Sequence, residues 1–267
     1  MNIRRITSSR NDRVKHWRKL ATRKGRDENG TLLIEGVHLL EEAVQAGWKI
    51  RAILVSDEGT HILDRVAGLG DAPIFSLYPS TFQQLVDTPS PQGIAAEVVV
   101  PSERGPLQSA DRARVLLLDA IQDPGNLGAI LRTAEAAGVR DVWLGTGTVD
   151  PYNPKVVRSA MGSLFRSRLR RVDLKKGIPE LKRQGYFIVS TSPRAERYHF
   201  RFEFPTKTAL LLGNEGRGVS PEVQALSDTH VQIPMPGEVE SLNVSVTAGI
   251  LLYELVRQDW TQGDGES

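Results

Sequence analysis

The sequence has 267 residues, of which 40% are hydrophobic and 25% are charged, and it contains no cysteine. This composition is typical of a folded globular chain of about two domains, and the lack of cysteine excludes disulfides, zinc fingers and thiol catalysis. No apolar run approaches the roughly 18 residues of a membrane helix, and the amino terminus lacks the apolar segment of a signal peptide. We therefore expect a soluble protein of the reducing cytoplasm with no membrane partner.

The net charge of +2 conceals two strongly basic zones. Residues 1–26 hold ten Lys and Arg against one acid, and residues 155–183 hold ten against two acids, so these zones carry +9 and +8. The total of +2 leaves −15 for the rest of the chain. Two basic zones on an acidic chain are typical of a protein that binds a polyanion such as nucleic acid, although solvated basic faces are also common.

The first hundred residues predict a small α/β domain. Residues 1–26 alternate basic and apolar positions, as in a basic amphipathic helix. The β-α-β-α-β order that follows favours parallel strands. Strands are expected at 31–36, 50–56, 73–77 and 94–100, and helices at 37–47, 61–69 and 80–86. Residues 101–112, rich in Pro, Ser, Gly and charge, predict a linker.

Residues 113–260 predict a second α/β domain, followed by a flexible tail over 261–267. Apolar runs give the strands, and periods near 3.6 residues give the helices. Strands are expected at 115–120, 141–145, 186–191, 208–213 and 230–234, and helices after Asn126, over 154–166, near 179–184 and over 241–258.

Polar, glycine-bearing loops follow three of these strands: IQDPGNLG after 115–120, NEGRGVS after 208–213 and MPGEVESLN after 230–234. Ligands of open α/β sheets bind beyond the carboxyl ends of the strands, so we expect a site there. Arg132 follows the first loop and lies off the apolar stripe of its helix, near a helix N-terminus that favours negative charge. The local sequence gives no reason for a cation at that position.

These loops do not carry the common nucleotide or metal signatures. The run GNEGRG has the spacing G-x-x-G-x-G, which is the reverse of the dinucleotide fingerprint, and no P-loop lysine follows any turn. This argues against a nicotinamide-dependent oxidoreductase. No histidines or carboxylates have metal-ligand spacing, so we expect no metal.

Three stretches resemble the successive motifs of the SpoU (TrmH) branch of the SPOUT RNA methyltransferases: NLGAILR (126–132), LLLGNEGRGVS (210–220) and IPMPGEVESLNVSVTAG (233–249). SPQGIAAEV (90–98) resembles the end of the L30e-like RNA-binding domain of the ribosomal RNA members. The resemblance implies an L30e-like domain over 1–100 and a SPOUT α/β domain with a deep C-terminal trefoil knot, a rare exception to the rule against knots.

The resemblance also implies S-adenosylmethionine as methyl donor and a ribose 2′-hydroxyl of RNA as acceptor, and we expect that RNA to be 23S ribosomal RNA. A nearly neutral adenosyl group needs amide partners and an apolar slot more than it needs charges. If the resemblance is set aside, the same residues can be interpreted as turn glycines, strand ends and the start of a helix. The implied donor contacts are Thr191, Gly213, Asn214, Gly218, Ile233, Met235 and Leu242.

Arg132 is the main catalytic residue that the resemblance implies. A guanidinium is not normally a free base, so we predict that Arg132 holds the phosphate of the target nucleotide and stabilises the developing alkoxide. The alternative is an exposed arginine paired with Glu135. Glu215 is expected to be buried and to accept hydrogen bonds from loop amides or from Arg132.

Asn126, Ser241 and Asn243 complete the implied catalytic set. Asn126 would orient the substrate or Arg132, and the other two would line the acceptor pocket. Helix capping is the alternative for Asn126 and Ser241, and a buried polar group bonded to backbone is the alternative for Asn243.

Family members pair as homodimers, and the small residues of the last helix allow such packing; Arg132 would then serve its own or its partner's site. The substrate alternatives are transfer RNA, or RNA bound by a non-catalytic factor with a degenerate methyltransferase domain. Basic residues of both zones are expected to contact RNA phosphates: Arg10, Arg13, Lys15, Arg18, Lys155, Arg158 and Arg166.

Overall fold

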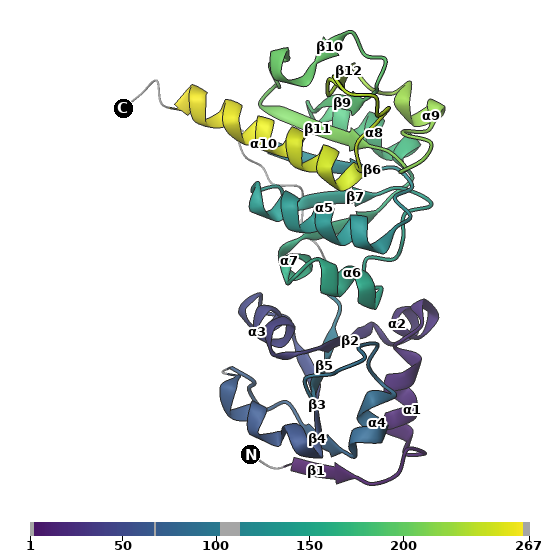
Figure 1. The fold of residues 1–267 in the computed structure, drawn as a ribbon, viewed down its shortest axis with the longest axis vertical. Coiled ribbons are helices and arrows are strands. Elements are labelled where there is room, and N and C mark those ends of the chain that lie inside the picture. Colours follow the sequence, from purple (N-terminus) through teal and green to yellow (C-terminus); the bar gives the residue numbers. More distant parts are fainter. Residues whose placement is uncertain (1–2, 67, 102–112, 264–267) are drawn as a thin grey trace. The chain divides into compact units, whose positions relative to one another are not determined.

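The computed structural model describes residues 3–66, 68–101 and 113–263 (Figure 1). Its contacts divide the chain into two units, which we describe separately. Unit 1 comprises residues 1–103 and 150–165, and unit 2 comprises residues 104–149 and 166–267. Residues 102–112 of the expected linker and residues 264–267 of the expected tail lie outside the described residues.

Unit 1 is built on a mixed five-stranded sheet in the order β1-β4-β3-β5-β2. β1 and β3 run parallel to β4, whereas β5 runs antiparallel to both β2 and β3. The expectation of parallel pairing is therefore wrong for β5, because an apolar run predicts a strand but not the direction of its neighbour. The strands are β1 (Ile3–Ile6), β2 (Thr31–Glu35), β3 (Ile50–Ser56), β4 (Ile74–Leu77) and β5 (Ile94–Val99).

The basic amino-terminal zone is not one helix. It forms β1 and then two short helices, because two polar side chains start new helices within it. The Asn11 side chain accepts a hydrogen bond from Arg13 N, and the Thr22 side chain accepts one from Gly25 N. Both are N-caps. The helical elements of this part are α1 (Asp12–Lys19), α2 (Arg23–Asn29), α3 (Val37–Gln45), the 3₁₀ helix η1 (Asp57–Arg65) and α4 (Pro79–Gln83).

Three of these elements can be compared with their predictions. α3 ends as expected before Gly47, whose φ of 73° only glycine adopts at low cost. The helix expected at 61–69 is η1, which starts earlier and is wound more tightly. The helix expected over 80–86 is shorter and ends at Gln83.

Residues 150–165 pack within unit 1, although in sequence they follow β7 (Asp141–Leu144), a strand of the other sheet. The buried Arg26 guanidinium donates to Asp150 Oδ2 at 2.5 Å, and Trp48 Nε1 donates to the backbone oxygen of Phe165 at 2.9 Å. The single helix expected over 154–166 is broken into α6 (Pro154–Ser159) and α7 (Ser163–Arg166). Positive φ angles at Met161 and Gly162, 49° and 92°, cause the break.

Unit 2 is built on a seven-stranded sheet whose pairings are all parallel, in the order β10-β12-β9-β11-β6-β7-β8. Its central strands are almost continuously apolar, because both faces of a parallel sheet are buried. The charged edge strands β8 and β10 were not predicted, since RLRR and RY lack an apolar signal. The strands are β6 (Ala113–Leu118), β7 (Asp141–Leu144), β8 (Arg168–Arg171), β9 (Phe187–Thr191), β10 (Arg197–Tyr198), β11 (Lys207–Leu212) and β12 (Thr229–Gln232).

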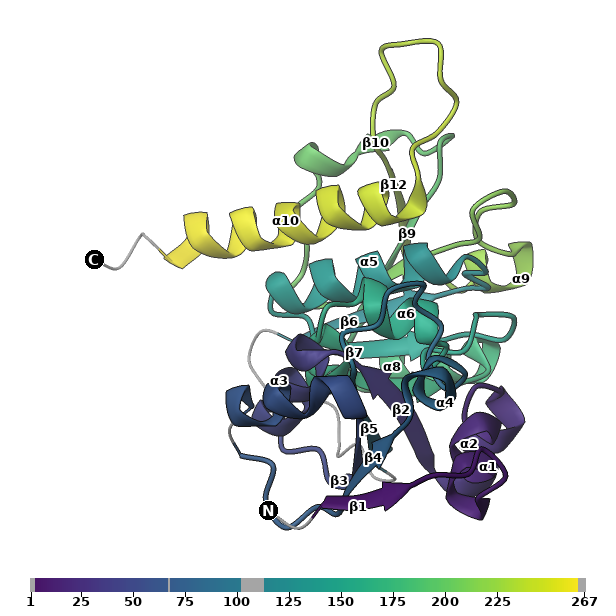
Figure 2. The same cartoon turned by 60° about the horizontal axis from the view of Figure 1, so that its bottom comes forward.

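Helices cover both faces of this sheet. α5 and α10 lie side by side on one face (Figures 1 and 2). Leu174, Ile178 and Leu181 of α8 pack with alternate strand residues such as Leu117 and Leu211. α8 starts earlier than expected and α10 starts later. The helical elements are α5 (Pro124–Ala136), α8 (Leu174–Arg183), the 3₁₀ helix η2 (His199–Arg201), α9 (Pro221–Gln224) and α10 (Val244–Gly263).

The fold class is therefore α/β in both units, as expected. A trefoil knot requires the C-terminal segment to pass through another loop of the chain. Strand order and register do not describe such a passage, so the knot stays a prediction. Across the described ranges, none of the helices has the length and apolarity needed to cross a bilayer.

Candidate functional site

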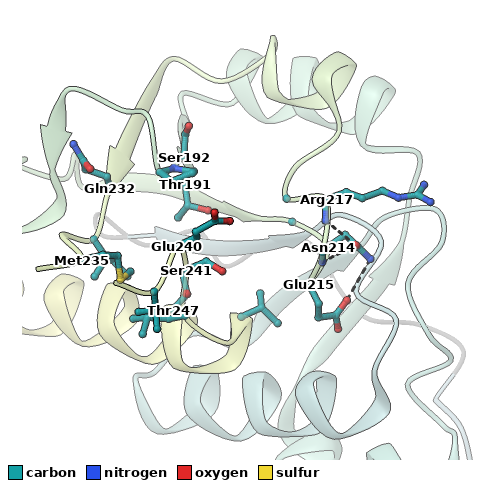
Figure 3. A pocket seen from close by; sticks show the side chains of 18 of the residues that line it. Thr191, Ser192, Asn214, Glu215, Arg217, Gln232, Met235, Glu240, Ser241 and Thr247 are labelled. Carbon is teal, nitrogen blue, oxygen red and sulfur yellow. Dashed lines mark hydrogen bonds between the residues drawn. The ribbon is translucent and has the colours of Figure 1, made fainter. Parts of the chain in front are cut away.

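A pocket of about 680 Å³ lies where loops at the carboxyl ends of three strands of unit 2 meet (Figure 3). Its wall comes from the segments after β9, β11 and β12 and from the first turns of α10. The volume is within the range of small-molecule sites, roughly 300–1,000 Å³. The parallel sheet therefore places a ligand-sized pocket at the edge where the sequence led us to expect a site.

The residues expected to contact a methyl donor all line this pocket, and so do Glu215 and Ser241. Glu240 and Ser241 lie in its middle, whereas the Arg217 side chain is directed away from it (Figure 3). The expected donor contacts come from three segments: Thr191 at the end of β9; Gly213, Asn214 and Gly218 after β11; Ile233, Met235 and Leu242 after β12.

The loop after β11 closes on itself so tightly that residue 213 has no room for a side chain. A Cβ built on Gly213 would lie 2.1 Å from the carbonyl carbon of Gly218. Asn214 and Gly218 exchange two backbone hydrogen bonds of 2.9 Å, and Gly218 has a φ of 69°. Two glycines are therefore required, and this side of the pocket presents backbone to a ligand.

The side chain of Asn214 fixes the same loop from within. Its Oδ1 accepts from the amides of Gly216 and Arg217 at 3.0 and 3.1 Å, and its Nδ2 donates to the backbone oxygen of Ala120 at 2.8 Å. The loop after β11 is thereby tied to the loop after β6. At the far end of the loop, the buried Asp119 accepts from the amide and hydroxyl of Ser220 at 2.8 and 2.7 Å.

Glu215 joins the loops after β6 and β11 through its carboxylate. It accepts from the amides of Gln122 and Asp123 at 3.2 and 3.0 Å and from Asn126 Nδ2 at 3.1 Å. Hydrogen bonds from loop amides were expected, but the residue is exposed, not buried. Desolvation alone would raise the pKa of Glu215, but the hydrogen bonds from Asp123, Asn126 and Gln122 outweigh it and lower that pKa.

Asn126 extends the connection to the third loop. Its Oδ1 accepts from Asn243 Nδ2 at 3.0 Å, and Asn243 Oδ1 accepts from the amide and hydroxyl of Ser245 at 2.8 and 2.6 Å. We call the connected set Glu215, Asn126, Asn243 and Ser245 the loop network. It joins the loops after β6, β11 and β12 in one chain of hydrogen bonds.

Two capping assignments are corrected by this geometry. Asp123, not Asn126, caps α5, because Asp123 Oδ1 accepts from Asn126 N at 2.8 Å. Asn243, not Ser241, accepts from the first turn of α10, which leaves Ser241 in the pocket wall. A proline at the first helical position selects the residue before it as the cap of α5.

Arg132 lies six residues after Asn126, which is about 9 Å along α5, and it does not line the pocket. Its side chain is exposed and has no hydrogen bond or ion pair with any residue that the structure describes. The alternative pairing with Glu135 is wrong, because Glu135 Oε1 accepts from Arg166 Nε at 2.8 Å. The expected bond between Glu215 and Arg132 is also absent from the described residues. Within the described part of the chain, Arg132 is thus an exposed cation without a partner on the surface of unit 2.

The expected RNA-binding residues divide into exposed and paired side chains. Arg10 is exposed, Lys15 lies 2.9 Å from Asp12, and the Arg13 guanidinium lies over the ring of Phe75. The other residues of the set have partners or lie on the surface: Arg18 donates to Gln84, Arg158 to Asp87, Arg166 to Glu135, and Lys155 is exposed.

Some pocket residues were missed from the sequence. Ser192 and Pro193 follow β9, and the rule that points to carboxyl strand ends would have found them. Gln232 ends β12, and Val239 and Glu240 lie in the loop after it, so the same rule applies to them. Thr247, on α10, carries no comparable signal. Among residues 3–66, 68–101 and 113–263, no group of three or more His, Asp or Glu is arranged to hold a metal ion.

Comparison with known proteins gives two family matches. Residues 113–253 match the model of the SpoU rRNA methylase family, and residues 11–96 match an MRM3-like substrate-binding domain. The first match covers the whole pocket and the loop network.

Individual relatives are similar over almost the whole chain. A 23S rRNA (guanosine(2553)-2′-O)-methyltransferase, RlmP, of Bacillus subtilis is 40% identical over 95% of this chain and 99% of its own. A 23S rRNA (uridine(2479)-2′-O)-methyltransferase of Streptomyces viridochromogenes is 33% identical over 96% and 92%. The crystal structure of the SpoU methyltransferase AviRb from that organism, in complex with AdoMet, has a TM-score of 0.84 and 30% identity over 94% of this chain and 98% of its own.

Proposed function

The chain belongs to the SpoU rRNA methylase family and is an S-adenosylmethionine-dependent RNA 2′-O-methyltransferase, and we propose that its substrate is 23S ribosomal RNA. The observation that supports methyl transfer in this chain is the loop network, which holds three strand-end loops around one pocket, and the choice of 23S rRNA rests on the named relatives. The reaction would take place in the cytoplasm, where bacterial ribosomes are assembled.

The pocket residues fit S-adenosylmethionine, which supplies the methyl group when it is bound. The closed loop at Gly213 offers backbone groups and leaves space that a Cβ would fill. Ile233, Met235 and Leu242 give an apolar wall on the other side. An adenosyl group, which is flat and mostly uncharged, suits a pocket of backbone amides and apolar side chains.

We assign the loop network a positioning role. Glu215 and Asn243 each bond to the side chain of Asn126 and so fix its orientation. Arg132 is assigned to the target nucleotide: its guanidinium would hold a phosphate and stabilise negative charge that develops on the ribose oxygen. Ser241, in the pocket wall, would face the acceptor.

Arg132 would act in the site of a second copy of the chain. It is exposed and does not line the pocket of its own unit. On α10, Val246, Tyr253 and Trp260 are exposed and spaced by seven residues, so they share one side of that helix. An exposed apolar stripe of this kind is typical of a protein interface. We therefore propose a homodimer that pairs through unit 2.

Ribosomal RNA is favoured over transfer RNA because two of the relatives that match along almost the whole chain, those of Bacillus subtilis and Streptomyces viridochromogenes, are named as 23S rRNA enzymes. Residues 11–96, which match a substrate-binding domain, carry part of the first basic zone. The basic side chains of α1 would bind phosphates and leave the choice of nucleotide to RNA shape and to unpaired bases.

The test is methyl transfer from tritiated S-adenosylmethionine to 23S rRNA, 16S rRNA and total tRNA from cells that lack this protein. Label is expected in 23S rRNA alone, at one position that resists alkaline hydrolysis. The position equivalent to guanosine 2553 of the Bacillus subtilis relative is the first to examine. Label confined to tRNA, or no label in any RNA, would overturn the proposal.

A further inference from the structure

Four aromatic residues alternate with polar residues in the run YHFRFEF, at positions 198, 200, 202 and 204. Phe202 and Phe204 are buried, with 9% and 5% of their surface exposed. Their rings meet edge to face at 5.0 Å and anchor the segment in unit 2. Tyr198 and Phe200, in contrast, are 37% and 45% exposed. The core therefore accounts for two of the four aromatic residues and leaves two unexplained.

The two exposed rings form an ordered pair. They stack with centroids 5.5 Å apart and planes 6° from parallel. His199 packs its ring edge to face against Phe200 at 5.2 Å, and the Arg201 guanidinium carbon lies 6.0 Å from the centroids of both rings. The two stacked rings and the nearby guanidinium form an ordered cluster in which each ring keeps one face that the other ring does not cover.

This aromatic pair adjoins the rim of the methyl-donor pocket. Tyr198 on β10 is paired in register with Gln232 on β12, and Gln232 lines the pocket. His199 Nδ1 lies 3.3 Å from the backbone oxygen of Gln232. Figure 2 shows β10 and the long loop after β12 at the same end of unit 2. An RNA chain that brings one ribose to the pocket would therefore pass close to Tyr198 and Phe200.

The charge around the pair suits a polyanion. Residues 194–201 contain three arginines against one glutamate, Glu196, so they form a basic island in the otherwise acidic part of the chain. Arg194, Arg197 and Arg201 are exposed. Aromatic faces interleaved with arginines are the recurrent means of binding unpaired RNA bases and their phosphates.

We propose that Tyr198 and Phe200 are a stacking site for an unpaired base of the substrate RNA, close in the chain to the methylated nucleotide. Arg201 and Arg197 bind the adjoining phosphates. This inference rests on the proposed RNA 2′-O-methyltransferase function and adds a specificity element to it. The arginines favour RNA over a second copy of the chain as the occupant, because they would be desolvated and unpaired against an apolar face.

The experiment compares the wild type with the double variant Tyr198→Ala/Phe200→Ala. The KM for 23S rRNA is expected to rise about 10- to 100-fold, with kcat changed less than about threefold and the Kd for S-adenosylmethionine unchanged. Phe200→Trp should keep the wild-type KM and Phe200→Leu should raise it, because leucine retains apolar area but has no ring to stack on a base.

Two labelled decamers of equal charge, oligouridine and an abasic ribose-phosphate chain, separate stacking from phosphate binding. The wild type should prefer oligouridine, and the double variant should bind both equally. An unchanged KM, an unchanged preference for oligouridine, or a double variant that is monomeric where the wild type is dimeric would each overturn the stacking site. Failure of the proposed function looks different: the wild type would prefer oligouridine yet transfer no methyl group to 23S rRNA.

Discussion

Unit 1 and unit 2 each contain a glutamate held by several hydrogen bonds, but the two are placed in opposite ways. Glu97 lies on β5 inside its sheet, 3% exposed, and accepts from His16 Nε2, Trp17 Nε1 and Thr31 Oγ1 at 2.9 Å each. Glu215 lies on an exposed loop and accepts from two backbone amides of a different loop and from the side-chain amides of Asn126 and Asn214. The first carboxylate fastens α1 to a sheet, and the second shapes a pocket that a ligand can enter.

Glu97 and Glu215 each accept several hydrogen bonds, so the number of bonds does not distinguish a carboxylate that stabilises the fold from one that shapes a ligand site. What differs is the partner: side chains of packed elements in unit 1, and loop amides at the carboxyl ends of strands in unit 2. A buried polar network stabilises a unique fold when it is fully satisfied, whereas a loop network fixes the position of groups that a ligand meets.

The largest effect is expected at Arg132, which belongs to neither network. Arg132→Ala should lower the rate of methyl transfer to 23S rRNA about 10²- to 10³-fold, since it removes one preorganised donor from the developing charge. Titration calorimetry should show unchanged affinity for S-adenosylmethionine, because Arg132 does not line the pocket. Arg132→Lys is the control and should recover only part of the rate. A near wild-type rate for Arg132→Ala would remove this residue from the mechanism.

A matched pair of variants, Glu215→Gln and Glu97→Gln, separates the two carboxylates directly. Glu215→Gln loses charge-assisted hydrogen bonds of about 1.5–3 kcal/mol, so the Kd for S-adenosylmethionine should rise about 10- to 100-fold. Glu97→Gln should leave that Kd unchanged but lower the Tm of unit 1 by on the order of 10 °C. Calorimetric titration and thermal melts of both full-length variants give the four measurements. Equal effects of the two variants on ligand affinity would contradict the distinction.

A smaller effect is expected from single charges on unit 1. Arg10→Gln should lower the slope of log Kd against log salt for 23S rRNA by about one unit. Arg158→Gln should change the slope by less, because Asp87 already lies 3.2 Å from the Arg158 guanidinium. Filter binding at several salt concentrations measures both. An equal or larger change for Arg158→Gln would mean that RNA displaces Asp87 from the arginine.

The smallest effect is expected from pH. The lowered pKa of Glu215 means that its hydrogen bonds stabilise the loops fully above the ordinary glutamate pKa, about 4.3, and that this contribution is lost as the pH falls through the lowered value. Affinity for S-adenosylmethionine should thus be flat between pH 8 and pH 5, with any loss confined to more acid solution. Glu215→Gln should remove that acid dependence. A titration near neutral pH in the wild type would show that another group controls the pocket.

The sequence predicts buried elements well and edges poorly. LLL in β6 and ALLL in β11 are apolar on both faces, so the apolar run and the burial agree there. The edge strands β8 and β10 are charged, and the break at Met161 and Gly162 lies in a run that reads as one helix. The direction of β5 depends on its neighbours in space.

At the site, the motifs predicted which residues line the pocket but not which atoms they bond. The chain from Glu215 to Asn126 to Asn243 joins residues 89 and 117 positions apart in sequence, and no local pattern specifies such partners. The pairing of Glu135 with Arg166 also depends on tertiary contact, and it is what leaves Arg132 without a local acid.

The closed turn at Gly213 also limits how this pocket can change. A methyl group at residue 213 would collide with Gly218, so this side of the pocket tolerates few substitutions. It presents backbone atoms, which any protein with the same turn would also present. Features specific to this protein must therefore come from side chains that line the pocket, such as Val239 and Glu240 on the loop after β12. An inhibitor meant to discriminate between this protein and others with the same turn should be extended toward those two side chains.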